Sequence, residues 1–198
     1  MDIILIIYIL WNISNKILDK EKEVGVKMDL LIKIIYYIAS ILSIFLFVIS
    51  VQHKEKKHIL LTQAFATMCY FITYLIVGAY SGCAVELIEQ TKDFVFYSYE
   101  NKNKKIPLIL LIVFASLLVL ASIVTFNGLY SLIPLLINLA YFISSYFKNP
   151  KHIRVVMLIC GFIWAYYNFK VGAYVIIIGN VLEIISAFIS LIRYKEEK

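Results

Sequence analysis

Ionisable side chains interrupt one of the long apolar segments of this 198-residue sequence, at a spacing that suits a helix. Glu86, Glu89 and Asp93 are separated by three, four and seven positions, so they share one helix face. A charged group at bilayer depth costs about 2.5–3.5 kcal/mol, and such groups usually face protein or water and mark function. We expect this face, which also carries Gly82, Gln90 and Tyr97, to point into the interior of the protein.

Aromatic and amide side chains add to this set from other apolar segments. An indole or phenol ring stacks on a flat or sugar-like face of a solute, while amides and carboxylates bind its polar edge. The predicted substrate-binding residues are Tyr70, Tyr74, Glu86, Glu89, Asn138, Trp164, Asn168, Asn180 and Glu183. The competing interpretation is hydrogen bonding between helices, worth about 0.6 kcal/mol per contact. We favour that interpretation for Asn138, and both stay open for Glu89 and Glu183.

One positive charge, that of Lys92, accompanies the three carboxylates of segment 82–99. Lys92 lies within one helical turn of Glu89, so the two can form a neutralising pair. Asp93 is then left without compensation, and we expect it to be solvated near the cytoplasmic end of its helix.

The composition indicates which medium surrounds these residues. The chain is 62% hydrophobic and 16% charged, and its mean hydropathy is +0.87. Soluble domains are about 45–50% apolar and about 25% charged, so lipid must cover much of this surface. A spanning helix needs about 20 mostly apolar residues. The sequence predicts an all-α integral membrane protein with seven transmembrane helices at 30–51, 58–80, 82–99, 106–126, 129–147, 155–174 and 175–193.

The basic residues predict the orientation of these helices. Lysines and arginines gather at 53–58, 100–105 and 148–154 and in the tail from Arg193, whereas the alternate connections at 81–82, 127–128 and 174–175 carry no charge. Basic loops stay cytoplasmic, so helix 1 begins outside and the C-terminus is cytoplasmic. We expect a multi-pass protein of the bacterial inner (plasma) membrane. The same confinement to loops argues against nucleic acid as a partner, although the net charge is +6.

Residues 1–27 fit this pattern less well. The apolar run 3–11 is too short to span a bilayer. Asp2 stands where a signal peptide has its basic region, which argues against a signal peptide. An interfacial helix, a poorly formed eighth span, and a mis-annotated extension upstream of a start at Met28 remain as alternatives.

Short motifs repeat at a fixed offset. Val-Gly-Ala-Tyr occurs at 77–80 and 171–174, and Lys-His-Ile occurs at 57–59 and 151–153, both 94 positions apart. The offset pairs Tyr70 with Trp164, Tyr74 with Asn168, Glu86 with Asn180 and Glu89 with Glu183. The sequence therefore predicts a 3+1+3 parallel repeat, with triplets at 28–105 and 127–198 (the second including the cytoplasmic tail) and a linker helix at 106–126. A single linker helix gives both triplets the same orientation.

This arrangement resembles that of the SWEET sugar transporters, their PQ-loop relatives and the PnuC vitamin transporters. The sequence is most similar to the bacterial inner-membrane family of the YgjV type, over about residues 55–193. The similarity is carried by 77–80, by 148–154, and by the Trp-Ala-Tyr-Tyr-Asn run at 164–168 leading to Gly172. The SWEET resemblance implies a central site formed by an aromatic residue on the second helix and an asparagine on the third. Trp164 and Asn180 match that pair, with Tyr70 and Glu86 as counterparts.

These features predict a small-solute transporter that works by alternating access between the two triplets. The solute would be a sugar, a nucleoside or a vitamin-like compound. The alternative is a non-transporting receptor or assembly factor of PQ-loop-like architecture. An enzyme is disfavoured, because no catalytic motif such as HExxH is present. We expect no metal or other cofactor; the expected partners are the lipid bilayer, a small polar solute and a second copy in a homo-oligomer.

Overall fold

The computed structural model describes residues 30–194, which form seven α-helices, one short 3₁₀-helix and no β-strand. The elements are α2 (Leu30–Ser50), α3 (Lys56–Ile76), α4 (Tyr80–Asn101), α5 (Leu108–Val124), η1 (Leu129–Leu132), α6 (Ile133–Tyr146), α7 (Lys151–Val171) and α8 (Tyr174–Arg193). The expectations for 1–27 concern residues outside this description. The chain divides into two units, Met1–Ile35 and Tyr36–Lys198, and the contacts described below lie within the second.

Six predicted spans each correspond to one α-helix, and the span expected at 129–147 is the 3₁₀-helix η1 followed by α6. Several helix ends also differ from the prediction. The span expected at 58–80 ends as a helix at Ile76, because Gly78 adopts a φ of +71° that breaks the helical path. The span expected at 155–174 begins earlier, at Lys151, directly after Pro150. Proline suits the start of a helix, where its missing N–H has no intrahelical partner to lose.

Five helical segments are long and apolar enough to cross a membrane: Leu30–Ser50, Lys56–Ile76, Leu129–Tyr146, Lys151–Val171 and Tyr174–Arg193. Two helices fall outside this group for different reasons. α5 carries no charge but has only 17 residues, and α4 is long enough but carries several charges. The spanning of these two helices therefore stays a prediction.

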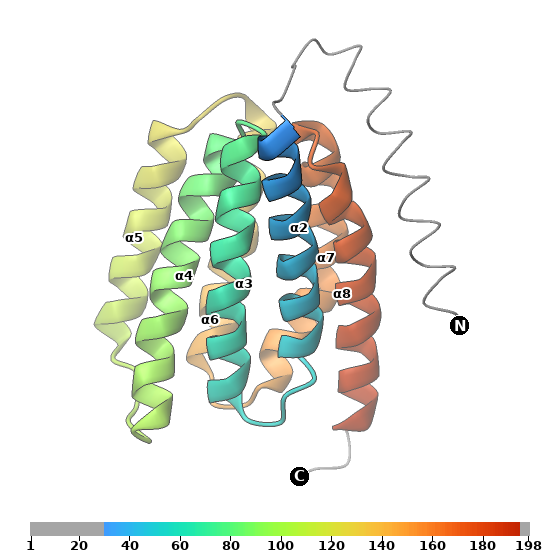
Figure 1. Cartoon of the computed structure of the whole chain (residues 1–198). Coiled ribbons are helices and arrows are strands. Elements are labelled where there is room, and N and C mark those ends of the chain that lie inside the picture. Colours follow the sequence, from blue (N-terminus) through green and yellow to red (C-terminus); the bar gives the residue numbers. More distant parts are fainter. Residues whose placement is uncertain (1–29, 195–198) are drawn as a thin grey trace. The chain divides into compact units, whose positions relative to one another are not determined.

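The helices of the second unit pack mainly in sequential pairs. α3 lies along α4 and α7 lies along α8, while α6 contacts α4, α5 and α7 (Figure 1). Phe96, Phe114 and Phe142 join α4, α5 and α6 through edge-to-face contacts, with ring centroids 6.1 and 6.2 Å apart. α2 reaches α8 through the Ser186 hydroxyl, which donates to the Val48 carbonyl at 2.7 Å.

The polarity of α4 is inverted relative to a soluble helix. Glu86, Glu89, Lys92 and Asp93 are all buried, whereas Leu87 is exposed. This arrangement puts the charges toward other helices and an apolar side chain outward, as expected for a helix surrounded by lipid. The predicted inward orientation of this face is therefore what the structure shows.

Backbone geometry recurs at the 94-residue offset found in the sequence. Gly78 and Gly172 have φ values of +71° and +79°. One residue later, the Ala79 N–H donates to the Tyr74 carbonyl and the Ala173 N–H to the Asn168 carbonyl, each at 2.9 Å. α4 and α8 then begin at Tyr80 and Tyr174, also 94 positions apart.

Candidate functional site

A small cavity lies among α2, α3, α4, α6, α7 and α8. Its volume is about 20 Å³, which is enough for one water molecule. Nine residues line it: Phe47, Tyr70, Tyr74, Glu86, Tyr141, Trp164, Ile176, Asn180 and Glu183. Six of the nine residues predicted to bind substrate are among them.

Hydrogen bonds connect the lining residues into a chain that begins and ends on α3. The Tyr74 hydroxyl donates to Asn168 Oδ1 at 2.7 Å, and Asn168 Nδ2 donates to Asn180 Oδ1 at 2.8 Å. Asn180 Nδ2 then donates to Glu183 Oε2 at 3.5 Å, and Glu183 Oε1 accepts from the Tyr70 hydroxyl. This series of hydrogen bonds connects α3, α7 and α8 to one another.

Aromatic rings form one wall of the cavity. The Tyr74 ring stacks between Tyr70 and Trp164, with centroids 6.3 Å from each. Tyr167 meets both Tyr74 and Trp164 edge-on, at 6.0 and 5.5 Å. Such a wall offers flat faces to a ring or a sugar-like solute.

Glu86 differs from the other polar residues of the cavity. It is 5% exposed and faces the cavity, yet within residues 30–194 its carboxylate has no hydrogen bond or ion pair. A buried polar group without a partner is costly in a packed interior. Glu86 is therefore the side chain of this cavity with the most unused capacity to bind a ligand.

Three predicted residues lie outside the cavity lining. Asn168 supports it through the hydrogen bonds to Tyr74 and Asn180. Asn138 Nδ2 donates to the Pro134 carbonyl of its own helix at 2.8 Å, so it is bonded within α6. Glu89 belongs to a separate charge cluster.

That cluster corrects the expectation for Asp93. Asp93 is 1% exposed and its Oδ1 lies 2.9 Å from Lys92 Nζ, so it is not solvated. α4 continues eight residues past Asp93 to Asn101, about 12 Å of helix, which places Asp93 well inside the bundle. Lys92 also pairs with Glu89, as its spacing indicated, and lies 5.0 Å from the Phe142 ring centroid.

The whole arrangement is that of a polar interior inside an apolar helical exterior. A family model described as a bacterial inner membrane protein, Imp-YgjV, matches residues 30–198. The chain belongs to this family. It is accordingly a multi-pass protein of the bacterial inner membrane. No curated protein and no solved structure matches the chain.

Three residues that line the cavity of this Imp-YgjV family member were not predicted from the sequence: Phe47, Tyr141 and Ile176. The 94-residue offset could have identified the first two. Phe47 and Tyr141 are 94 positions apart, as are Tyr70 and Trp164, and Glu86 and Asn180. Applying the offset to the aromatic residues of the apolar segments would have paired Tyr141 with Phe47 and added both to the candidate set. Ile176 carried no comparable signal, because isoleucine is abundant throughout the apolar segments.

Proposed function

We propose that this protein is a small-solute transporter in which two three-helix repeats expose the central cavity alternately to the two sides of the membrane. The observation that carries the proposal is Glu86. Its side chain is 5% exposed and lines the cavity, and its carboxylate has no partner among the described residues. A carboxylate inside a helical bundle is ordinarily paired or hydrogen-bonded, so an unpaired one that lines a cavity supports a ligand-binding role.

The 3+1+3 repeat is the architectural part of this proposal. It is supported by the three pairs of cavity residues that stand 94 positions apart, each pair with one member on α2–α4 and one on α6–α8. The matching backbone geometry at Gly78 and Gly172 adds to this support. A pseudo-twofold axis through the cavity would bring equivalent residues of the two repeats together there.

The small size of the central cavity is what a closed state of such a transporter would have. The central cavity, at about 20 Å³, is far smaller than the 300–1,000 Å³ typical of small-molecule sites. A recess of about 160 Å³, lined by residues such as Ser81 and Tyr130, lies at the end with uncharged connections. We infer that access to the cavity opens and closes by movement of the two triplets against each other.

Tyr167 is the best candidate for the closure between the recess and the cavity. Its ring packs against the cavity residues Tyr74 and Trp164. Its hydroxyl lies 2.9 Å from Ser81 Oγ, and the Gly82 N–H donates to it at 2.9 Å. Gly82 leaves room for this contact, because a Cβ there would lie 2.9 Å from the Tyr167 oxygen.

The chemistry of the lining favours a polyhydroxyl or cationic solute with a flat face. The aromatic rings of the lining supply apolar surface, and Glu86 supplies a hydrogen-bond acceptor. Sugars, nucleosides and vitamin precursors meet this description.

One observation favours a different function, that of a non-transporting receptor or assembly factor. The cavity residues are tightly packed, and the hydrogen-bond chain from Tyr74 to Tyr70 already satisfies most of their polar groups. A protein that needs only a rigid bundle would use these contacts as interhelical bonds.

A ligand screen by thermal shift separates the two functions. The purified full-length protein is heated in detergent in the presence of monosaccharides, nucleosides or vitamin precursors. The same screen is run on the double variant Trp164→Ala plus Asn180→Ala. We expect a stabilising solute for the native protein and none for the double variant, with Asn138→Ala responding like the native protein. Stabilisation that survives the double substitution would place the binding site elsewhere, and a screen without any binder would favour the receptor.

A further inference from the structure

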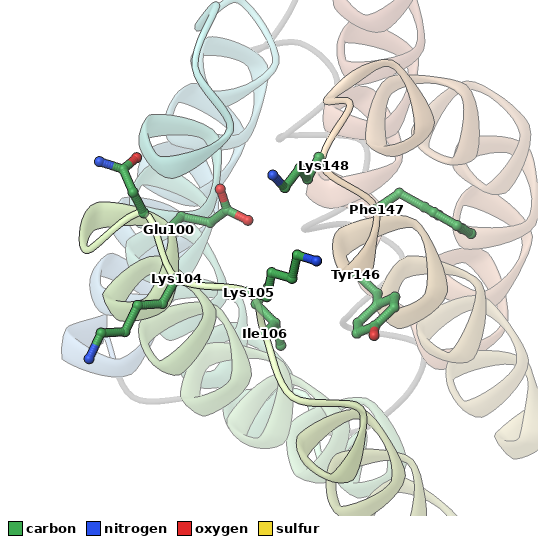
Figure 2. Close-up of a pocket in the computed structure, with 8 residues that line it drawn as sticks. Glu100, Lys104, Lys105, Ile106, Tyr146, Phe147 and Lys148 are labelled. Carbon is green, nitrogen blue, oxygen red and sulfur yellow. The ribbon is translucent and has the colours of Figure 1, made fainter.

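A basic pocket lies where the α4–α5 loop meets the end of α6, and it shares no residue with the central cavity (Figure 2). Its volume is about 510 Å³, within the range of small-molecule sites. Its lining includes Glu100, Lys104, Lys105, Tyr146, Phe147 and Lys148.

Among residues 30–194, the positive charge of this pocket is not balanced by carboxylates. Lys105 and Lys148 extend their ammonium groups into the space between the two loops, whereas Lys104 points away (Figure 2). Glu100, the one carboxylate of the lining, is bound by Lys56 at 2.7 Å. Within the described part of the chain, no carboxylate pairs with Lys105 or Lys148. The pocket therefore attracts an anion.

The loop that presents Lys105 has a defined backbone. Asn103 adopts a left-handed φ of 51°, and its N–H donates to the Glu100 carbonyl at 3.0 Å. The Lys104 N–H donates to the Tyr99 carbonyl at 2.9 Å. These two bonds close the C-terminus of α4, and the buried Ile106 holds the far end of the loop. The site is thus formed before any ligand binds.

An apolar surface continues directly from the pocket. α5 begins two residues after Ile106, and its first turn exposes Leu108 and Ile109, followed by Ile112 one turn later. Residues at these separations lie on one side of a helix. A ligand could therefore place an anionic group in the pocket and an apolar group along the exposed face of α5.

We propose that the basic pocket binds the phosphodiester headgroup of an anionic phospholipid, with its acyl chains along α5. Lysine pockets between membrane helices on the cytoplasmic side suit such headgroups. The pocket is formed by two of the basic loops that the charge pattern assigns to the cytoplasmic face. A free phosphate ion could meet the same ammonium groups, but it would gain nothing from the α5 surface.

Retention of lipid by the full-length protein tests this proposal. The protein is delipidated in detergent, offered phosphatidylglycerol or phosphatidylcholine, and examined by native mass spectrometry and thermal shift. Each lysine near an anionic headgroup contributes about a fivefold change in affinity. We expect about a twentyfold preference for phosphatidylglycerol, lost in Lys105→Gln plus Lys148→Gln and retained in Lys105→Arg plus Lys148→Arg.

Control variants distinguish binding in this pocket from nonspecific attraction of anionic lipid to the lysines at this end of the protein. Lys57→Gln plus Lys151→Gln removes two lysines at the same end of the helices that do not line the pocket, and should keep the preference. Equal loss in both glutamine variants, or no preference in the native protein, would overturn the proposal. Protection by inorganic phosphate or glycerol phosphate at the concentration of lipid would also overturn it, since the site would then bind soluble anions.

Discussion

The Tyr74 hydroxyl on α3 donates a 2.7 Å hydrogen bond to Asn168 Oδ1 on α7, and the two residues stand 94 positions apart. Gln63 Nε2 and Met157 Sδ, again 94 positions apart, lie 3.6 Å from each other. Residues that the sequence repeat pairs by position are therefore also in contact. This is what a pseudo-twofold axis between α3 and α7 requires, because only residues near such an axis meet their own counterparts.

The first prediction concerns the hydrogen-bond chain around the cavity. Asn168→Ala leaves the Tyr74 hydroxyl and Asn180 Oδ1 without their partners in a buried place. We expect a loss of about 1–3 kcal/mol in unfolding free energy, measured by thermal or denaturant unfolding in detergent. Asn138→Ala is the matched control, since its amide bonds only within α6, and it should cost less than about 1 kcal/mol. Equal losses of stability in the two variants would show that the hydrogen bonds around the cavity contribute no more than a bond within one helix.

The second prediction concerns the buried charge cluster of α4. Lys92→Met removes the cation that faces both Glu89 and Asp93, so two carboxylates remain buried without compensation. The expected cost is about 3–5 kcal/mol, seen as low yield and a lower unfolding temperature. Adding Asp93→Asn to Lys92→Met should recover part of the loss. Lys57→Gln, which breaks an exposed pair with Glu55, should leave the unfolding temperature close to that of the native protein. A Lys92→Met protein as stable as that control would contradict the account of the cluster.

The third prediction concerns closure at Tyr167. Tyr167→Phe removes the oxygen that contacts Ser81 and Gly82, so the barrier between the recess and the cavity should open more often. Cys83, buried one residue after Gly82, reports on this opening when it is the single remaining cysteine. We expect a membrane-impermeant maleimide to modify Cys83 several-fold faster in the variant. Unchanged protection would assign Tyr167 a packing role alone.

The fourth prediction concerns the contact between α3 and α7. With cysteines at positions 63 and 157, a short bifunctional thiol reagent should join the two helices, because the native side chains meet there. Cysteines at 63 and 159 serve as the control, since Ile159 is exposed on another face of α7. Equal cross-linking of both pairs would mean that α3 and α7 do not pack as described.

Sequence patterns predicted the helices well and their ends less well. Long apolar runs and the inward spacing of Glu86, Glu89 and Asp93 were sufficient to place α4 as a helix with a buried polar face. The ends depended on local backbone geometry, as at Gly78, where a left-handed φ ends the helix before hydropathy falls. Asp93 was misplaced because hydropathy does not reveal that Lys92 contacts both of its acidic neighbours.

For the candidate site, the repeat was more informative than residue type. Tyr70, Trp164, Glu86 and Asn180 were predicted as two pairs, and all four line one cavity. For Asn138 we favoured a hydrogen bond between helices, but its amide instead donates to the Pro134 carbonyl of its own helix. The size of the cavity could not be predicted from the sequence, because it depends on how closely the rings of Tyr74 and Trp164 pack.

Alternating access to the central cavity is tested most directly by single cysteines on α8. In a background with Cys69, Cys83 and Cys160 replaced by alanine, a cysteine at Asn180 faces the cavity, while one at Ala187, two turns away, lies in the core. A small, impermeant methanethiosulfonate is applied to reconstituted vesicles from one side or the other. Our account predicts modification at position 180 from either side and none at 187. Protection at 180 from both sides, or access from one side only, would contradict it.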